Sequence, residues 1–145
     1  MMNLLSRLFR FRTRSLPAMP VIVTAEKSLS PELAAGLGKL YDASPEFSGG
    51  AEAVATAERV LSEGGLVYVG WFNGKPVSSI MAFGPGDQRT LRWIVVHPAN
   101  RGRGIADRLV CEVCRIEREA GSTHFLPGCT AIARLLRIEA SRRKA

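Results

Sequence analysis

Long hydrophobic runs are absent from this chain of 145 residues. No apolar stretch approaches the roughly 18 residues that a membrane-spanning helix needs, so we expect no membrane association. Low-complexity tracts and repeats of fixed period are also missing, which excludes fibrous and solenoid architectures. The composition that remains, 46% hydrophobic and 23% charged, is typical of one globular domain with a single hydrophobic core.

Cysteine is scarce, with three residues at Cys111, Cys114 and Cys129. Cys111 and Cys114 form a C-x-x-C, a spacing that also occurs in metal and redox sites. The pair falls inside a strong helical pattern, and no second C-x-x-C or H-x-x-x-H completes a zinc ligand set. We therefore predict buried, apolar cysteines and no metal site. We also expect a cytoplasmic location, because nothing in the sequence requires an oxidising compartment.

Acidic residues are absent from the first 18 positions, which carry four arginines, and the chain ends in a second basic cluster at Arg142–Lys144. Without these two groups the net formal charge of +7 falls to zero. A nucleic-acid-binding domain would show a basic stripe interleaved with aromatics on a folded face, so we exclude nucleic acid as a partner. We assign residues 1–19 to a basic extension that we expect to be disordered, with a targeting peptide as the alternative, and residues 20–145 to one domain.

Hydrophobic periodicity predicts an α/β fold with a mostly antiparallel sheet and one βαβ crossover at its C-terminal end. The predicted elements are a strand at 20–24, helices at 31–41 and 51–63, strands at 66–72, 75–83 and 89–96, a helix at 105–120, a strand at 122–126 and a helix at 129–142. Asn73-Gly74 is a strong signal for a two-residue hairpin. In the strand 89–96, alternation predicts Leu91, Trp93 and Val95 on one face and Arg92, Ile94 and Val96 on the other.

The loop before the clearest helix carries the residues that we expect to bind a ligand. Gly102 and Gly104 allow positive φ angles and let the backbone approach a ligand closely. The first N–H groups of the following helix have no intrahelical partners, and the helix dipole is positive there, which favours an anion such as a pyrophosphate. Arg101 and Arg103 add positive charge nearby.

The spacing in this loop is neither the G-x-G-x-x-G of dinucleotide-binding folds nor a Walker motif. It matches R-x-x-G-x-A at Arg101, Gly104 and Ala106, and V-x-P precedes it at Val96. In this strand–loop–helix context the chain resembles the GNAT superfamily, the Gcn5-related N-acetyltransferases, over residues 20–142. The resemblance implies the GNAT fold, without the final hairpin that walls the acceptor site in that family.

The resemblance also implies acetyl-CoA or coenzyme A as the cofactor. In the family, the strand before the loop separates from its parallel neighbour, and its backbone pairs with the pantetheine arm. That role falls on Ile94, Val95 and Val96. The pyrophosphate binds the loop and the helix start, which here comprise Asn100, Arg101, Gly102, Arg103, Gly104, Ile105, Ala106 and Asp107.

The usual catalytic pair of the family is missing. Many members place a glutamate base four residues before the valine of V-x-P, where this chain has Arg92. Many also place a tyrosine acid in the last helix. That helix has none here, and Tyr41 and Tyr68 lie upstream. His97 is a possible substitute base, although a loop histidine at this position is typical of a cap, so the catalytic residues stay unknown.

The chain has the cofactor loop but lacks this catalytic pair. In this respect it resembles one branch of the superfamily, the PanZ type. Members of that type are acetyl-CoA sensors and maturation factors of aspartate α-decarboxylase. Further short similarities are Lys39-Leu40-Tyr41 before Pro45, the Phe72-Asn73 turn and the loop 101–105. The resemblance implies an acetyl-CoA-binding regulator with aspartate α-decarboxylase as a partner and with weak or no transferase activity. The alternative is an active N-acetyltransferase that moves acetyl from acetyl-CoA to an amine.

Overall fold

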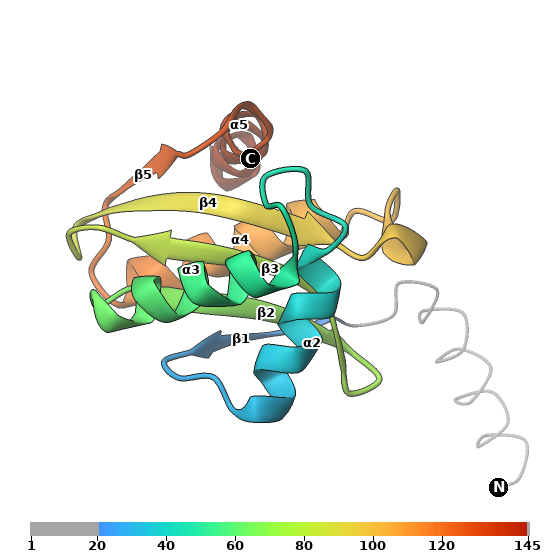
Figure 1. Ribbon diagram of the computed structural model, residues 1–145. Coiled ribbons are helices and arrows are strands. Elements are labelled where there is room, and N and C mark those ends of the chain that lie inside the picture. Colours follow the sequence, from blue (N-terminus) through green and yellow to red (C-terminus); the bar gives the residue numbers. More distant parts are fainter. Residues whose placement is uncertain (1–20, 145) are drawn as a thin grey trace, which may run out of the picture.

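The computed structural model describes residues 21–144 and contains a five-stranded sheet with the strand order β1-β2-β3-β4-β5 (Figure 1). Its elements are β1 (Ile22–Glu26), α2 (Pro31–Tyr41), α3 (Gly50–Ser62), β2 (Leu66–Phe72), β3 (Lys75–Phe83), β4 (Gln88–Val96), η1 (Pro98–Asn100), α4 (Ile105–Glu119), β5 (His124–Pro127) and α5 (Thr130–Lys144). No helix within residues 21–144 is long and apolar enough to cross a membrane. The predictions for residues 1–19 lie outside the described residues.

The sheet is mixed, as predicted. Strands β1 to β4 pair as antiparallel neighbours, whereas β4 and β5 pair in parallel across the connection through α4. Helices α2 and α3 cover one face of the sheet and share a core with Val67, Val69 and Met81. Helices α4 and α5 cover the opposite face, where they pack on Tyr68 and Ile80. Figure 1 shows α2 and α3 in front of the sheet and α4 behind it.

Local sequence signals account for the start of α2 and for its contact with α3. The Ser30 hydroxyl accepts the Leu33 N–H at 3.1 Å, and Pro31 occupies the first turn, where its missing N–H costs nothing. Helices α2 and α3 cross at Gly38 and Gly50, where a Cβ on Gly50 would overlap the Gly38 carbonyl. The two helices therefore approach closely enough for backbone contact.

Strand β4 contains a β-bulge, and the predicted alternation of its side chains is wrong for this reason. Its pairing with β3 shifts by one residue between Ser79 and Met81, and Trp93 adopts a φ of 58°. The extra residue reverses the alternation, so that Leu91 packs against α4 and α5, whereas Trp93 and Val95 pack against α2 and α3. One strand thereby contributes to both cores.

Strands β4 and β5 separate part-way along β4 and form a fork. Their pairing ends at Leu91 and Pro127, and the Gly128 N–H makes the last contact, to the Leu91 carbonyl at 2.8 Å. A Cβ on Gly128 would lie 2.6 Å from the Arg92 Cβ, so the residue at this point must be very small. Beyond Arg92, β4 pairs only with β3 among the described strands.

The C-terminal cluster of basic residues lies in the last turns of a helix. Arg142 and Arg143 belong to α5 and form ion pairs with Asp107 at 2.6 Å and with Glu139 at 3.1 Å. These pairs attach the end of α5 to α4 and to its own preceding turn. Local sequence could not predict the pair of Arg142 with Asp107, because Asp107 lies far away along the chain.

Candidate functional site

The loop between β4 and α4 is built by a short turn and two left-handed glycines. The Nδ1 atom of His97 accepts the Ala99 N–H at 3.1 Å, so this side chain caps η1. Gly102 and Gly104 have φ angles of 78° and 74°, as predicted. Gly104 is the N-cap of α4 and offers no side chain to the first helical N–H groups. These amides therefore remain available to an anionic ligand.

A groove runs along the C-terminal half of β4. It begins as a cavity of about 260 Å³ between this half-strand, the α2–α3 loop and α5. It continues as a cavity of about 240 Å³ over the start of α4. Five residues line both cavities and join them, namely Val96, Arg101, Ala106, Arg134 and Leu135.

The edge of β4 that faces this groove presents the backbone groups of Val96. The His97 N–H donates to the Val77 carbonyl of β3 at 2.8 Å. Successive residues of a strand direct their N–H and C=O groups to opposite edges, so those of Val96 point into the groove. The Arg101 guanidinium donates to the Val96 carbonyl at 3.2 Å and to the Ala43 carbonyl at 3.4 Å, and so spans the groove.

The structure brings ten of the eleven predicted cofactor residues to this groove. They are Ile94, Val95, Val96, Asn100, Arg101, Gly102, Gly104, Ile105, Ala106 and Asp107. Arg103 lines neither cavity. Sequence reasoning missed the opposite wall, which consists of Ala43, Ser44 and Pro45 together with Ala131, Arg134, Leu135 and Ile138 of α5. The α5 residues of this wall are spaced by three and four, a pattern in the sequence that places them on one face of the helix.

Comparison with known proteins identifies the family. Residues 63–141 match the acetyltransferase (GNAT) domain, which is more than half of the chain. The chain belongs to the GNAT acetyltransferase family. No curated protein sequence matches this GNAT chain.

Several solved structures share its fold. One is an aminoglycoside 6'-N-acetyltransferase in complex with coenzyme A, with 22% identity and a TM-score of 0.58 over 70% of this chain and 57% of that protein. A GNAT family N-acetyltransferase from Escherichia coli in complex with CoA has 21% identity and a TM-score of 0.61 over 77% and 63%. A ribosomal-protein-alanine N-acetyltransferase from Brucella melitensis has 15% identity and a TM-score of 0.61 over 77% and 81%. The chain thus spans less than two thirds of the first two proteins, and these likenesses establish the fold.

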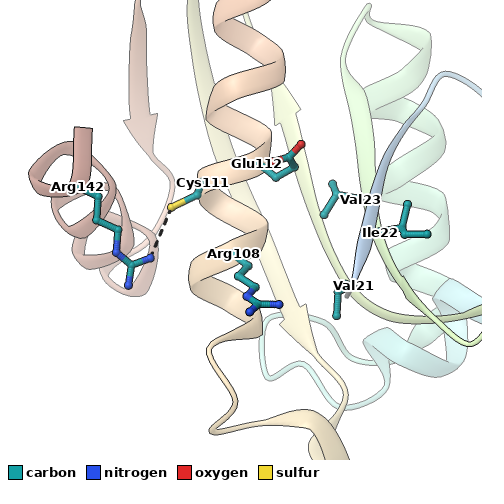
Figure 2. A pocket seen from close by; sticks show the side chains of 7 residues that line it. All are labelled: Val21, Ile22, Val23, Arg108, Cys111, Glu112 and Arg142. Carbon is teal, nitrogen blue, oxygen red and sulfur yellow. Dashed lines mark hydrogen bonds between the residues drawn. The ribbon is translucent and has the colours of Figure 1, made fainter. Parts of the chain in front are cut away.

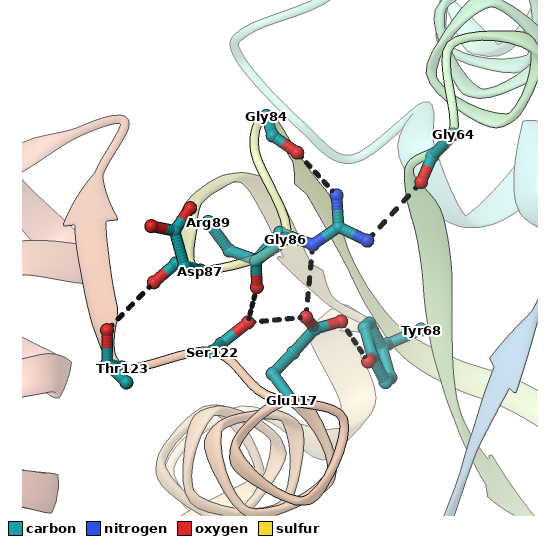
Figure 3. Close-up of polar contacts among 9 residues, drawn as sticks. All are labelled: Gly64, Tyr68, Gly84, Gly86, Asp87, Arg89, Glu117, Ser122 and Thr123. Carbon is teal, nitrogen blue, oxygen red and sulfur yellow. Dashed lines mark hydrogen bonds and ion pairs between the residues drawn. The ribbon is translucent and has the colours of Figure 1, made fainter.

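Both tyrosines of this GNAT domain have structural positions. The Tyr41 hydroxyl donates to the Trp93 carbonyl at 2.6 Å and lies 3.1 Å from Ser79 Oγ, so it anchors the bulge of β4. The Tyr68 hydroxyl donates to Glu117 at 2.5 Å in a buried network (Figure 3). Burial raises the pKa of each hydroxyl far above its ordinary value. Neither side chain is therefore placed to protonate a leaving group in the groove.

The outer side of α4 carries a separate cavity of about 440 Å³, bounded by β1 and the end of α5 (Figure 2). Arg142 donates to the Cys111 sulfur there at 3.9 Å. Burial raises the pKa of the Cys111 thiol, and that of Cys114 to about 12, so both stay protonated at neutral pH. All three cysteines are free, and among the described residues no group of three or more His, Cys, Asp or Glu side chains could hold a metal ion.

Proposed function

We propose that the GNAT domain binds acetyl-CoA in the groove along β4. The observation that supports this most directly is the free edge at Val96, which ends at the uncapped start of α4. The pantetheine arm would pair with the backbone of Ile94–Val96. The pyrophosphate would accept hydrogen bonds from backbone N–H groups between Gly102 and Asp107. Arg101 and Arg134 line the groove on either side and add positive charge. Two proteins of similar fold hold coenzyme A in their crystal structures.

Calorimetric titration with acetyl-CoA and thermal melting test this proposal. A ligand at about 100 times its Kd stabilises the folded state by about 2.7 kcal/mol, which a melting curve detects. Gly104→Asp places a carboxylate where the pyrophosphate would bind, and we expect it to abolish the shift. Gly104→Asn is the matched control, because it has the same size and the same left-handed backbone without the charge. An unchanged melting temperature of the unmodified protein in millimolar acetyl-CoA contradicts the proposal.

N-acetyl transfer to an amine is the activity that we propose for this cofactor site. It is supported by a carboxylate at the fork, where Glu46 lies 3.5 Å from the Arg92 guanidinium. The sequence favoured a regulator because position 92 lacks a carboxylate, but a base can also come from another segment of the chain. Release of free CoA thiol from acetyl-CoA in the presence of an amine measures this activity.

Regulation of aspartate α-decarboxylase, as in the PanZ type, is the second candidate function. It is supported by Arg92 in place of the family's glutamate and by an α5 without tyrosine. Such a regulator would act in the cytoplasm and would bind the decarboxylase more tightly with acetyl-CoA present. Recovery of the purified decarboxylase on the immobilised protein, with and without acetyl-CoA, tests this function. Equal recovery in both conditions contradicts it.

A further inference from the structure

An ion pair lies at the fork where β4 and β5 separate. Glu46, in the loop between α2 and α3, places Oε2 3.5 Å from Nε of Arg92. Arg92 is the first residue of β4 beyond its pairing with β5, and its Cβ and Cγ lie against Gly128. Ser44 and Pro45, which directly precede Glu46, line the groove. Glu46 and Arg92 themselves line neither cavity, so their ion pair lies at the fork, beside the groove.

Packing and hydrogen bonds hold the loop that carries Glu46. The Phe47 ring makes an edge contact with Tyr41 at 5.5 Å and stacks on Trp93 at 5.9 Å between ring centroids. The Glu46 N–H donates to Ser44 Oγ at 3.3 Å. Such support reduces the reorganisation that a reaction at this carboxylate requires.

The ion pair leaves part of the carboxylate free. Arg92 contacts Oε2, and within residues 21–144 no hydrogen bond or ion pair involves Oε1. The Glu46 side chain is 27% exposed, so both a substrate and water can reach it. Burial, and to a smaller extent the charge of Glu46, raise the pKa of the Tyr41 hydroxyl, so this group stays protonated.

We propose that Glu46 is the catalytic residue that binds and deprotonates the acceptor amine, and that Arg92 is the positioning residue that orients its carboxylate. This inference rests on the proposed acetyl-CoA site and on the amine transfer proposed above. A carboxylate beside the partly buried aromatic rings of Phe47 and Trp93 suits a cation on an aliphatic stem.

The reaction balances with these groups. Glu46 Oε1 accepts one proton from the ammonium group, and the amine lone pair then forms a C–N bond to the thioester carbonyl carbon. The tetrahedral adduct collapses, the C–S bond breaks, and its electron pair leaves on the sulfur. The nitrogen of the adduct loses a second proton to water, and water protonates the thiolate to give the CoA thiol. Glu46 then releases its proton to solvent, so one proton is released in each turnover.

Arg92 acts through Glu46. Its guanidinium also lies 4.7 Å from the centre of the Trp93 ring, which fixes it between the ring and the carboxylate. Held at Oε2, the carboxylate directs Oε1 toward the acceptor. Arg92→Leu should therefore lower kcat with little effect on the affinity for acetyl-CoA, and Arg92→Lys should recover part of the loss.

The experiment uses the full chain with acetyl-CoA and three probes, which are spermidine, kanamycin and a peptide with a free α-amino group. Calorimetry measures amine binding to the protein loaded with CoA, and thiol release measures turnover. We expect Glu46→Gln to reduce kcat/KM by roughly 10²- to 10⁴-fold and to leave acetyl-CoA affinity within about twofold. Glu58→Gln, at an exposed position of α3, is the matched control and should behave like the unmodified protein.

The pH profile separates a base from a structural residue. The unmodified protein should show a nearly flat kcat/KM from pH 7 to 9, because the substrate binds as an ammonium ion and loses its proton to the carboxylate within the complex. Without the base only the neutral amine reacts, so Glu46→Gln should gain about tenfold per pH unit below the pKa of the amine. Equal profiles, or acetyl-CoA binding without binding or turnover of any amine, overturn the inference alone. Failure to bind acetyl-CoA overturns the proposed function as well.

Discussion

Two arginine–glutamate pairs start from the same strand, three residues apart, and their surroundings differ. Arg89 pairs with Glu117 at 3.0 Å, with side chains that are 12% and 2% exposed. Arg92 pairs with Glu46 at 3.5 Å, with side chains that are 46% and 27% exposed. The first pair lies where β4 is paired with β5, and the second lies just beyond the fork.

The two pairs also differ in their hydrogen bonds. Glu117 also accepts from Tyr68 and Ser122, and Arg89 also donates to the Gly84 and Gly64 carbonyls (Figure 3). Every charged atom of this network thus has a protein partner, which leaves no site for a substrate. The pair at the fork keeps a free carboxylate oxygen. The arginine–glutamate pair at one end of β4 therefore stabilises the fold, whereas the pair at the fork leaves a carboxylate oxygen accessible to a substrate.

The largest expected effect is on stability, at the buried pair. Glu117→Ala leaves Arg89 buried without its counterion, and we expect the free energy of unfolding to fall by about 3–5 kcal/mol. Glu46→Ala removes an exposed pair and should cost at most about 1 kcal/mol. Urea denaturation of both variants measures the difference. Equal losses would show that the two pairs do not differ as their surroundings indicate.

Gly128→Ala tests the fork that separates the two pairs. The added Cβ would meet Arg92 Cβ at 2.6 Å and the Leu91 carbonyl at 2.8 Å, so the strands must move. We expect a loss of about 1–3 kcal/mol by urea denaturation, and a lower kcat because Arg92 is displaced. Gly86→Ala, where a Cβ meets nothing within 4 Å, is the control. Unchanged stability at position 128 would contradict the geometry of the fork.

Alkaline pH should weaken the buried network and spare the exposed pair. Burial and Glu117 raise the pKa of Tyr68 in the folded state, so the folded protein holds the hydroxyl proton more tightly than the unfolded chain does. Its contribution to stability is fully present below the ordinary tyrosine pKa of about 10 and is lost as the pH rises above it. Tyr68→Phe should cost about 1–3 kcal/mol at neutral pH and should reduce this alkaline loss. Urea titrations at pH 7 and pH 11 measure both effects.

The smallest expected effect is the coupling energy of the exposed pair. A double-mutant cycle with Arg92→Leu and Glu46→Gln should give about 0.2–1 kcal/mol in dilute buffer. At 1 M salt the Debye length is about 3 Å, so the coupling should fall toward zero. The coupling of Arg89 with Glu117 should persist, because burial limits screening. A salt-resistant coupling at the fork would mean that this pair is desolvated too.

Sequence patterns predicted the order of elements because each signal is local. Asn73 and Gly74 form the expected hairpin with φ angles of 51° and 74°, and Ser30 caps α2. The loop glycines and the start of α4 are also where the pattern placed them. In such segments the chain near a residue determines its conformation.

Features that depend on distant segments could not be predicted. The bulge at Trp93 is defined by its register with β3 and by the hydroxyl of Tyr41, so alternation within β4 cannot reveal it. Glu46 lies in a loop with no periodic pattern. Its proposed role depends on its contact with Arg92, which is far away along the chain. Arg134 lines the groove only because α5 packs beside β4, which the pattern of the last helix does not reveal.

The open edge of β4 also has a consequence for hydrogen exchange. The N–H groups of Val95 and His97 point toward β3, whereas that of Val96 faces the groove. In the free protein the Val96 amide should therefore exchange with solvent deuterium much faster than the amide of His97, although both belong to the same ordered segment. Pantetheine paired along this edge would slow the Val96 amide selectively, so a single residue reports whether the groove is occupied.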